Sequence, residues 1–554
     1  MRLKELKKIN QINNHQDISA YFSQSNKLAS NPPFSLFIDI DPKQPKNYIT
    51  FLTQSGLGLP DRDYYLKTDP QSTQLKTDYV EHITTMLSIL GLKQTKNKAK
   101  KIMVLETAIA NIHWSRNEQR DRDKTYNKIK LSDLSKLFPN FNWKHFINES
   151  KIPNQAHIII REISYFKPFT SLFSKTSVND WKDYFKWHLI NTYSTNLTEK
   201  IYQSHFDFYS TKLSGIPTSS KRWKRAVNSV DKLIGEIVAK PYVKKYFQPQ
   251  AKKKMIQLVE NLRAAYKNAI INLDWMGEKT KKQALIKLEK FNPKIGYPNK
   301  WIDYSQLIIK EDDLVGNYIR ASQFHYQREI NKLDQPINKE EWAMTPQTVN
   351  AYYNPSINEI VFPAAILQPP FFNMNADDAI NYGAIGAVIG HEMGHGFDDQ
   401  GAKSDGDGVL KNWWTQADLN EFKKRTQKLA DQYSLFEALP NEFINGDLTL
   451  GENIGDLGGL TIAFKAYKIS QINSSDKIID GFTGEQRFFI GWAQVWAYKY
   501  REKALRNRLT TDPHSPANFR VNGPLMNMPE FIKAYDVKAK DKMFREEKDR
   551  VKIW

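Results

Sequence analysis

The chain of 554 residues contains no cysteine and no long apolar run. Without cysteine no disulfide bond can form, and a metal ion could be held only by His, Asp and Glu side chains. No apolar stretch approaches the roughly 18 residues that a membrane-spanning helix needs, and no apolar segment follows the basic start MRLKELKKINQINN. We therefore expect no transmembrane segment. As it stands the chain would be cytoplasmic, whereas a leader preceding Met1 would place it in the periplasm or outside the cell.

The composition is that of a folded protein with large cores. Hydrophobic residues make up 40% and charged residues 25% of a length that predicts two large domains. The net charge is +19, from 80 Lys and Arg against 61 Asp and Glu. The lysines are spread along the chain, and no recognition helix or aromatic RNA-binding signature accompanies them. We expect no nucleic-acid partner, an alternative that a salt-dependent shift assay would test.

The apolar pattern predicts a mainly α protein with little sheet. Segments 34–41 and 48–52 alternate as two short strands, and segment 255–273 repeats apolar residues every three or four positions, as one face of a helix does. Similar helical stretches cover 177–200, 221–240, 312–332, 412–435 and 484–505. Residues 345–370 are rich in Pro, Asn and Tyr and contain an expected edge strand. We place the boundary there, giving an N-terminal helical lobe 1–346 and a C-terminal domain 347–554.

The sequence HEMGH at 391–395 has the spacing of a zinc site. On a helix, His391 and His395 face the same side one turn apart, and Glu392 lies beside them. Zinc lowers the pKa of a bound water toward roughly 7, and an adjacent carboxylate can take its proton during attack on a carbonyl. The alternative is a core helix whose histidines make ordinary hydrogen bonds. The glycines in the preceding YGAIGAVIG weaken a helix, so they indicate close approach by another element.

A second motif, GENIGDLGGL at 451–460, can complete the site. A catalytic zinc usually has three protein ligands and an open position, and Glu452 supplies the third ligand of a His, His, Glu set. Asp456 follows four residues later on the same helical face and can accept the second ring N–H of a ligating histidine. The alternative is a solvated acidic helix face, which the glycine-rich surroundings disfavour.

Four ordered motifs carry a family resemblance: HEMGHGFDDQG at 391–401, GENIGDLGGL, NAYYNPSINEIVFPAAILQPPFF at 350–372 and HSPANFR at 514–520. Together with GLGLPDRDYY at 56–65 and the final EKDRVKIW, they resemble the neprilysin and endothelin-converting enzyme family, including its bacterial PepO-like neutral endopeptidases. The resemblance covers nearly the whole chain. It implies two helical lobes around a central cavity, with 347–554 as a thermolysin-like zincin catalytic lobe and 1–346 as the lobe that caps its active site. It also implies one Zn²⁺ per chain and short peptides as substrates.

The same resemblance implies roles for further residues. Asn350 and Ala351 would hold the extended peptide backbone, His514 would stabilise the oxyanion, and Arg520 would bind a substrate carbonyl. Positioned donors of this kind stabilise a developing negative oxygen. Taken alone, His514 and Arg520 would be ordinary loop residues.

An apolar pocket for the residue after the scissile bond is also implied by the resemblance. Its walls would be Ile366, Phe371, Val388, Val495 and Trp496. The alternative is that these residues are simply core. The resemblance thus predicts cleavage on the amino side of large hydrophobic residues, with broad selection because apolar walls discriminate modestly.

The resemblance has one departure at the N-terminal end. Relatives have some tens of residues before the segment that matches 34–41, and these contribute arginines that bind the substrate's terminal carboxylate. No position here matches them, so we expect an N-terminal segment to be lacking. The prediction is a monomeric zinc oligopeptidase, and its rival is an inactive peptide-binding scaffold.

Overall fold

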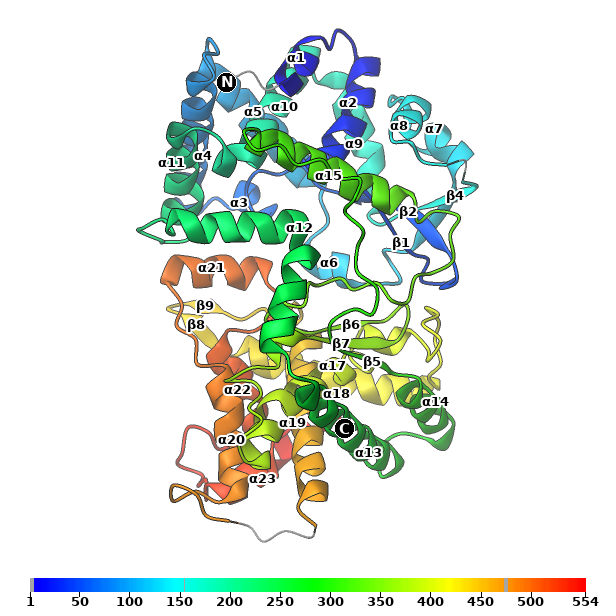
Figure 1. The fold of residues 1–554 in the computed structure, drawn as a ribbon, viewed down its shortest axis with the longest axis vertical. Helices are drawn as coiled ribbons and strands as arrows, with labels where there is room; N and C mark the ends of the chain where they lie inside the picture. The colour runs from blue at the N-terminus through cyan, green and yellow to red at the C-terminus, as the bar shows by residue number, and fades with distance from the viewer. Residues whose placement is uncertain (1–3, 154, 473–476) are drawn as a thin grey trace.

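The computed structural model describes residues 4–153, 155–472 and 477–554. It consists mainly of helices, arranged as an upper and a lower lobe with α12 (Arg222–Tyr246) and α21 (Glu502–Thr511) between them (Figure 1). Within the described part of the chain, none of the helices is both long and apolar enough to cross a bilayer. The mainly α prediction is therefore confirmed.

The upper lobe is built from the elements up to α11, which ends at His205, and from α15. Its helices are α1 (Lys4–Asn10), α2 (His15–Lys27), α3 (Asp63–Leu66), α4 (Pro70–Ile89), α5 (Thr95–Ile112), α6 (Arg116–Arg120), α7 (Leu134–Leu137), α8 (Trp143–Glu149), α9 (Ile163–Lys175), α10 (Val178–Tyr193), α11 (Glu199–His205) and α15 (Leu314–Ile330). Its strands are β1 (Phe34–Ile40), β2 (Tyr48–Gln54), β3 (Asn127–Lys130) and β4 (His157–Ile160), in the order β1-β2-β4-β3. The two strands predicted at 34–41 and 48–52 are confirmed as the antiparallel pair β1 and β2.

The lower lobe contains the glycine-rich motifs. Its helices are α13 (Pro249–Ile271), α14 (Glu278–Glu289), α16 (Asp378–Asn381), α17 (Ala387–Gly394), α18 (Gln416–Ser434), α19 (Leu450–Ser470), α20 (Gly484–Val495), α22 (Ala517–Leu525) and α23 (Pro529–Ala534). Its strands are β5 (Asn292–Gly296), β6 (Tyr352–Asn354), β7 (Glu359–Pro363), β8 (Glu437–Leu439) and β9 (Glu442–Phe443). In the sheet β5-β7-β6 the edge strand expected from 345–370 is β6, while β7 is central.

One predicted helix is wrong as a single element. Segment 484–505 forms α20, which ends at Val495, and α21, which begins at Glu502. The aromatic rings of Trp496, Tyr498 and Tyr500 contact one another in the irregular connection. Both helices are amphipathic, so their periodicity runs through the break and hides it. The stretch 177–200, also predicted as one helical stretch, contains α10 and the first two residues of α11.

Each lobe has its own hydrophobic core, but the core of the lower lobe also includes residues that precede the predicted boundary at 347. The largest core joins α17, α19 and α20 to α13, α14 and β5, which precede residue 347. Two further cores fill the upper lobe. The boundary between residues 346 and 347 stays a prediction, but side chains from before it complete the core around the glycine-rich motifs.

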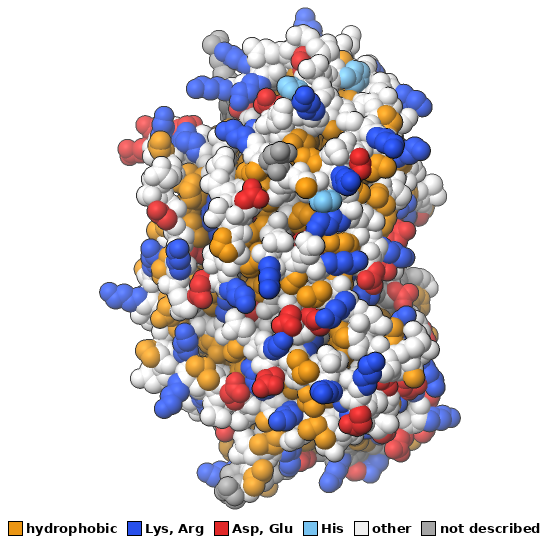
Figure 2. Space-filling model, turned by 90° about the vertical axis from the view of Figure 1, so that its right-hand side faces the viewer, with side chains coloured by type: hydrophobic (Ala, Val, Ile, Leu, Met, Phe, Trp, Pro, Cys, Tyr) orange, Lys and Arg blue, Asp and Glu red, His pale blue; other side chains and the backbone are white. Residues whose placement is uncertain are grey.

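The surface charge is dispersed. On the face drawn in Figure 2, Lys and Arg side chains are mixed with Asp and Glu side chains and do not gather into one basic patch. This face therefore shows no electrostatic footprint of the kind that nucleic-acid binding requires.

Candidate metal centre

Two helices cross at a contact made by glycines. A Cβ atom on Gly390 would lie 2.5 Å from the carbonyl oxygen of Gly459, closer than two atoms can approach. Gly455 likewise lies under the ring of His391, where a Cβ would come within 2.8 Å of Nδ1. The glycines therefore let α17 and α19 approach closely, as the sequence predicted, and they place His391 directly opposite the first turn of α19.

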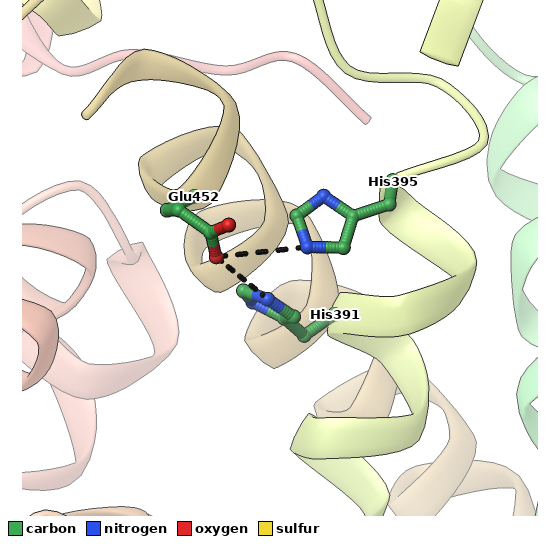
Figure 3. Close-up of side chains that lie close together, drawn as sticks. All are labelled: His391, His395 and Glu452. Carbon is green, nitrogen blue, oxygen red and sulfur yellow. Dashed lines mark ion pairs between the residues drawn. The ribbon is translucent and has the colours of Figure 1, made fainter. Parts of the chain in front are cut away.

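His391, His395 and Glu452 converge on one point (Figure 3). Glu452 Oε2 lies 3.2 Å from His391 Nε2 and 3.6 Å from His395 Nε2. The two imidazole rings are 4.5 Å apart between centroids. One donor atom from each residue lies within 4.8 Å of the others. The structure thus brings together the three residues that the sequence proposed as ligands.

The second ring nitrogen of each histidine faces a carboxylate. His391 Nδ1 lies 2.9 Å from Asp456 Oδ1, and His395 Nδ1 lies 2.9 Å from Asp398 Oδ2. The partner of His391 is the predicted one. The sequence analysis missed Asp398, although its position three residues after His395 in HGFDD was a usable signal. These contacts direct both Nε2 atoms toward Glu452.

The donor set fits a zinc ion. Glu452 Oε2 is buried and, within the described residues, accepts no hydrogen bond of good geometry, although imidazole nitrogens face it. Donors bound tetrahedrally at about 2.0–2.1 Å are separated by roughly 3.3 Å. The observed separations of 3.2 and 3.6 Å match that spacing. Two imidazoles and one carboxylate are also the ligand types that zinc prefers in catalytic sites.

Electrostatics at this point favour a cation. Burial acts to lower the pKa of His395, but Glu452 and Asp398 more than offset it and raise the pKa well above its usual value. Burial acts to raise the pKa of Glu452, but His395 and His514 hold it well below the usual value. The carboxylates are therefore charged, and they favour a positive charge at this buried point. A divalent ion can take the place of the protons on the histidines.

Glu392 is positioned for proton transfer. Its side chain is buried beside the two histidines, and it forms no hydrogen bond with the residues that the structure describes. Burial raises its pKa, while His391 and His395 act in the opposite direction. A buried carboxylate without a fixed partner has its oxygens available to a substrate or a water molecule.

His514 reaches the same carboxylate from the connection between α21 and α22. Its Nε2 lies 3.2 Å from Glu452 Oε2, and its Nδ1 lies 2.8 Å from Asp512 Oδ1. Burial acts to lower the pKa of His514, but Glu452 and Asp512 raise it to about 9. The structure thus brings His514 to the centre, and its raised pKa favours the cationic form.

Arg520 is tied to the second carboxylate of α19. Its Nε and Nη2 donate to Asp456 at 2.7 Å each, and its guanidinium lies 3.9 Å from the ring centroid of Trp496. Nη1 of Arg520 has no hydrogen-bond partner among the described residues, so it is available to another acceptor. Asp456 therefore links His391 to Arg520.

The other predicted site residues differ in exposure. Asn350 is exposed and Ala351 is buried, directly before the edge strand β6. The predicted apolar walls divide into buried core residues, Ile366, Val388 and Val495, and half-buried residues that pack against that core, Phe371 and Trp496. Burial does not distinguish a core position from a pocket wall, so the substrate pocket stays a prediction.

A segment of the upper lobe reaches the metal centre. Arg120 donates to the carbonyl oxygen of Asp447 at 2.7 Å and to Asp399 Oδ1 at 3.1 Å. Arg122 donates to Ser404 Oγ at 2.8 Å. Side chains of the upper lobe therefore hold the segments that follow α17 and precede α19. No pattern in the sequence indicates these contacts.

A cavity of about 690 Å³ lies between the lobes. It is lined by α3 and α4 above and by β9 and α21 below, and it reaches Leu448, two residues before the start of α19. None of the predicted ligands lines it. The cavity therefore does not contain the metal centre.

The paired histidines, the carboxylate of the crossing helix and the free Glu392 together define a zincin-type metallopeptidase centre in a helical fold. Family models described as peptidase family M13 match residues 2–298, as its N-terminal part, and residues 350–551. The chain belongs to peptidase family M13. The predicted resemblance is thereby confirmed, and the protein is a zinc metallopeptidase by family.

Individual relatives agree with this assignment. Endothelin-converting enzyme 1 of Mus musculus is 34% identical over 523 residues, which cover 91% of this chain and 67% of that protein. The Mycobacterium tuberculosis zinc metalloprotease Zmp1, in complex with an inhibitor, is 42% identical with a TM-score of 0.96, covering 100% of this chain and 85% of that one. PepO from Lactobacillus rhamnosis is 25% identical with a TM-score of 0.90, covering 100% and 86%.

Proposed function

We propose that this protein is a monomeric zinc oligopeptidase that binds one Zn²⁺ per chain through His391, His395 and Glu452. The observation that carries the proposal is the convergence of these three side chains on one point. Glu392 is buried beside them and forms no hydrogen bond with any residue that the structure describes. When bound, zinc supplies a Lewis acid that polarises the scissile carbonyl and acidifies water.

Glu392 is the proposed proton carrier. Its carboxylate takes a proton from the attacking water and later passes that proton to the leaving amine, so that one group serves as base and then as acid. Burial supports this role because it raises the pKa of Glu392 and so makes the carboxylate a better base. The absence of a hydrogen-bonded partner within the described residues leaves it free to move between the two positions.

His514 and Arg520 are the proposed donors to the substrate. A cationic His514, fixed through Nδ1 by Asp512, donates through Nε2 to the oxygen that becomes negative during attack. Arg520, fixed by Asp456, offers Nη1 to a neighbouring substrate carbonyl. Asp456 thus orients both His391 and Arg520, which couples the metal centre to substrate binding.

Substrate length and side chain are set by different parts of the site. Asn350 and the edge strand β6 would align an extended peptide, because an open strand edge offers backbone hydrogen bonds. Phe371 and Trp496, with the core residues behind them, would form the pocket for a large hydrophobic side chain after the scissile bond. Enclosure between two lobes would admit short peptides and exclude folded proteins.

The test compares the protein with Glu392→Gln on a library of short peptides. We expect cleavage before Phe and Leu, complete inhibition by a chelator, and a loss of about 10²–10⁴-fold in kcat/KM for the variant with zinc retained. Glu278→Gln is the matched control, because that side chain is 92% exposed and lies on the surface of α14. Full activity of Glu392→Gln would refute the proton role, and bound zinc without cleavage of any peptide would favour a binding scaffold.

A further inference from the structure

A loop that follows the metal helix supports one of its ligands. Residues 396–404, here the support loop, carry Asp398, whose Oδ2 lies 2.9 Å from His395 Nδ1. The other oxygen of Asp398 accepts the backbone N–H groups of Gln400 and Gly401 at 2.8 and 2.5 Å. The position of Asp398, and with it the orientation of His395, therefore depends on the conformation of the support loop.

A buried lysine of the neighbouring helix α14 binds the support loop. Lys287 extends from α14 and is 1% exposed. Its Nζ lies 2.6 Å from the carbonyl oxygen of Gly396, 2.8 Å from that of Gly401 and 2.7 Å from that of Ser404. An ammonium has three N–H donors, and these three carbonyls use all of them. One side chain thus ties the first residue, the middle and the last residue of the loop together.

The surroundings of Lys287 are unusual for a cation. Its Nζ lies 5.7 Å from the ring centroid of Phe397 and 5.9 Å from that of Tyr353. Burial, with Arg122 nearby, lowers the pKa of Lys287 to about 7. Asp398 and Asp405 act in the opposite direction, but within the described residues neither forms an ion pair with it. Burying a charge without a carboxylate partner is costly, so a packing role would be served better by an apolar side chain.

We propose that Lys287 is a positioning residue for the metal centre: its ammonium fixes the support loop so that Asp398 holds His395 in the orientation that binds zinc. The inference rests on the proposed ligand set of His391, His395 and Glu452. A carboxylate partner on the second nitrogen fixes the tautomer and direction of a histidine ligand, and losing such a partner weakens metal binding by roughly 10–100-fold. Without Lys287, the carbonyl of Gly396 loses the one donor that it has among the described residues, whereas those of Gly401 and Ser404 keep one donor each, from the N–H of Ser404 and from Trp413 Nε1. The loop must then rearrange to satisfy the buried Gly396 carbonyl.

The experiment measures zinc release from Lys287→Met in the full chain. Zinc-loaded protein is mixed with excess chelator, and the release rate is recorded together with the unfolding temperature of the metal-free protein. We expect release to be about 10-fold faster in Lys287→Met. Lys290→Met is the matched control at the C-terminal end of the same helix, because Lys290 is 45% exposed and pairs with Asp407 on the surface. Its release rate should equal that of the unmodified protein.

A pair of double variants separates positioning from general destabilisation. If Lys287 acts through Asp398, adding Lys287→Met to Asp398→Asn should accelerate release little further, whereas adding it to Asp456→Asn should multiply the two effects. Equal acceleration in both backgrounds would overturn the inference, as would a release rate for Lys287→Met equal to that of Lys290→Met. Lys287→Gln, which keeps two N–H donors without the charge, replaces Lys287→Met if the latter does not fold. Failure of the unmodified protein to bind zinc would instead refute the proposed metal centre itself.

Discussion

Three histidines of the lower lobe and three of the upper lobe have opposite surroundings, while His188 of the upper lobe faces one buried carboxylate, Glu106, at 2.9 Å. In the lower lobe, His391, His395 and His514 each face two carboxylates, and their pKa values are raised. In the upper lobe, His82 stacks on the ring of Phe208 at 5.1 Å, and burial lowers its pKa to about 3. The side chain is the same, so its neighbours decide whether it attracts a cation or stays neutral in a core.

The comparison explains why, in the part of the chain that the structure describes, His391 and His395 form a metal site and the upper-lobe histidines do not. His113 and His205 resemble His82, because burial lowers the pKa of each to about 4. A neutral histidine among aromatic rings needs one or two hydrogen bonds and nothing more. A histidine between two carboxylates has a surplus of negative charge beside it, and that surplus is what a divalent ion neutralises.

Replacing Glu452 should have the largest effect, because all three lower-lobe histidines face its carboxylate. Glu452→Gln keeps the shape but removes the charge that faces all three lower-lobe histidines. We expect zinc affinity to fall by more than the roughly 10–100-fold that outer partners contribute, and kcat/KM to fall to the chelated level. Zinc titration and peptide cleavage measure both. Tight zinc binding by a folded Glu452→Gln variant would contradict the assignment of this ligand.

Replacing His514 should separate catalysis from metal binding. His514→Gln keeps a hydrogen-bond donor but loses the positive charge, so we expect kcat to fall by about 10²–10³-fold. The zinc content and KM should change little, because His514 is not among the proposed ligands. Steady-state kinetics with zinc analysis checks this prediction, and loss of zinc with loss of activity would instead make His514 part of the metal site.

The two outer carboxylates should contribute to metal retention in different ways. Asp398→Asn and Asp456→Asn each remove the charge from the partner of one histidine ligand, so zinc affinity should fall by about 10–100-fold in each. Only Asp456→Asn should also raise KM, because Asp456 holds Arg520 with two hydrogen bonds. Competition with a chelator and peptide kinetics measure the two effects. Identical KM changes in both variants would remove the proposed role of Arg520.

The smallest expected effect concerns the upper lobe in acid. The folded pKa of His82 is about 3, below the usual value of 6.5, so the unfolded chain binds a proton between these values and the folded protein does not. His82 therefore costs no stability above pH 6.5, and the free energy of unfolding falls as the pH drops from 6.5 toward 3. His82→Gln should reduce the loss of unfolding free energy between pH 6.5 and 5.5 by about 1 kcal/mol. Urea unfolding at the two pH values tests this, and an unchanged difference would contradict it.

Patterns within single elements were predictable from the sequence. Helical periodicity indicates α13, the alternation at 34–41 indicates β1, and HEMGH with GENIGD indicates the ligands, because each signal depends on spacing along one element. The break at Trp496 was not predictable, since the periodicity of α20 and α21 continues through it.

Contacts that join distant segments were not predictable. Lys287 is one of many lysines, and only the fold shows that it is buried against the support loop, more than a hundred residues further along the chain. Arg120 belongs to the upper lobe, and nothing in its neighbourhood indicates that it binds Asp399. Such outer supports depend on how elements pack, which spacing along one element does not encode.

The central claim is that one zinc ion is bound by two imidazoles and the carboxylate of Glu452. Metal analysis combined with X-ray absorption at the zinc edge tests it most directly, on the purified protein and on Glu452→Gln. The account predicts one zinc per chain with two histidine nitrogens and oxygen ligands, and loss or altered coordination of zinc in the variant. A folded protein without zinc, or a zinc environment that Glu452→Gln leaves unchanged, would contradict it.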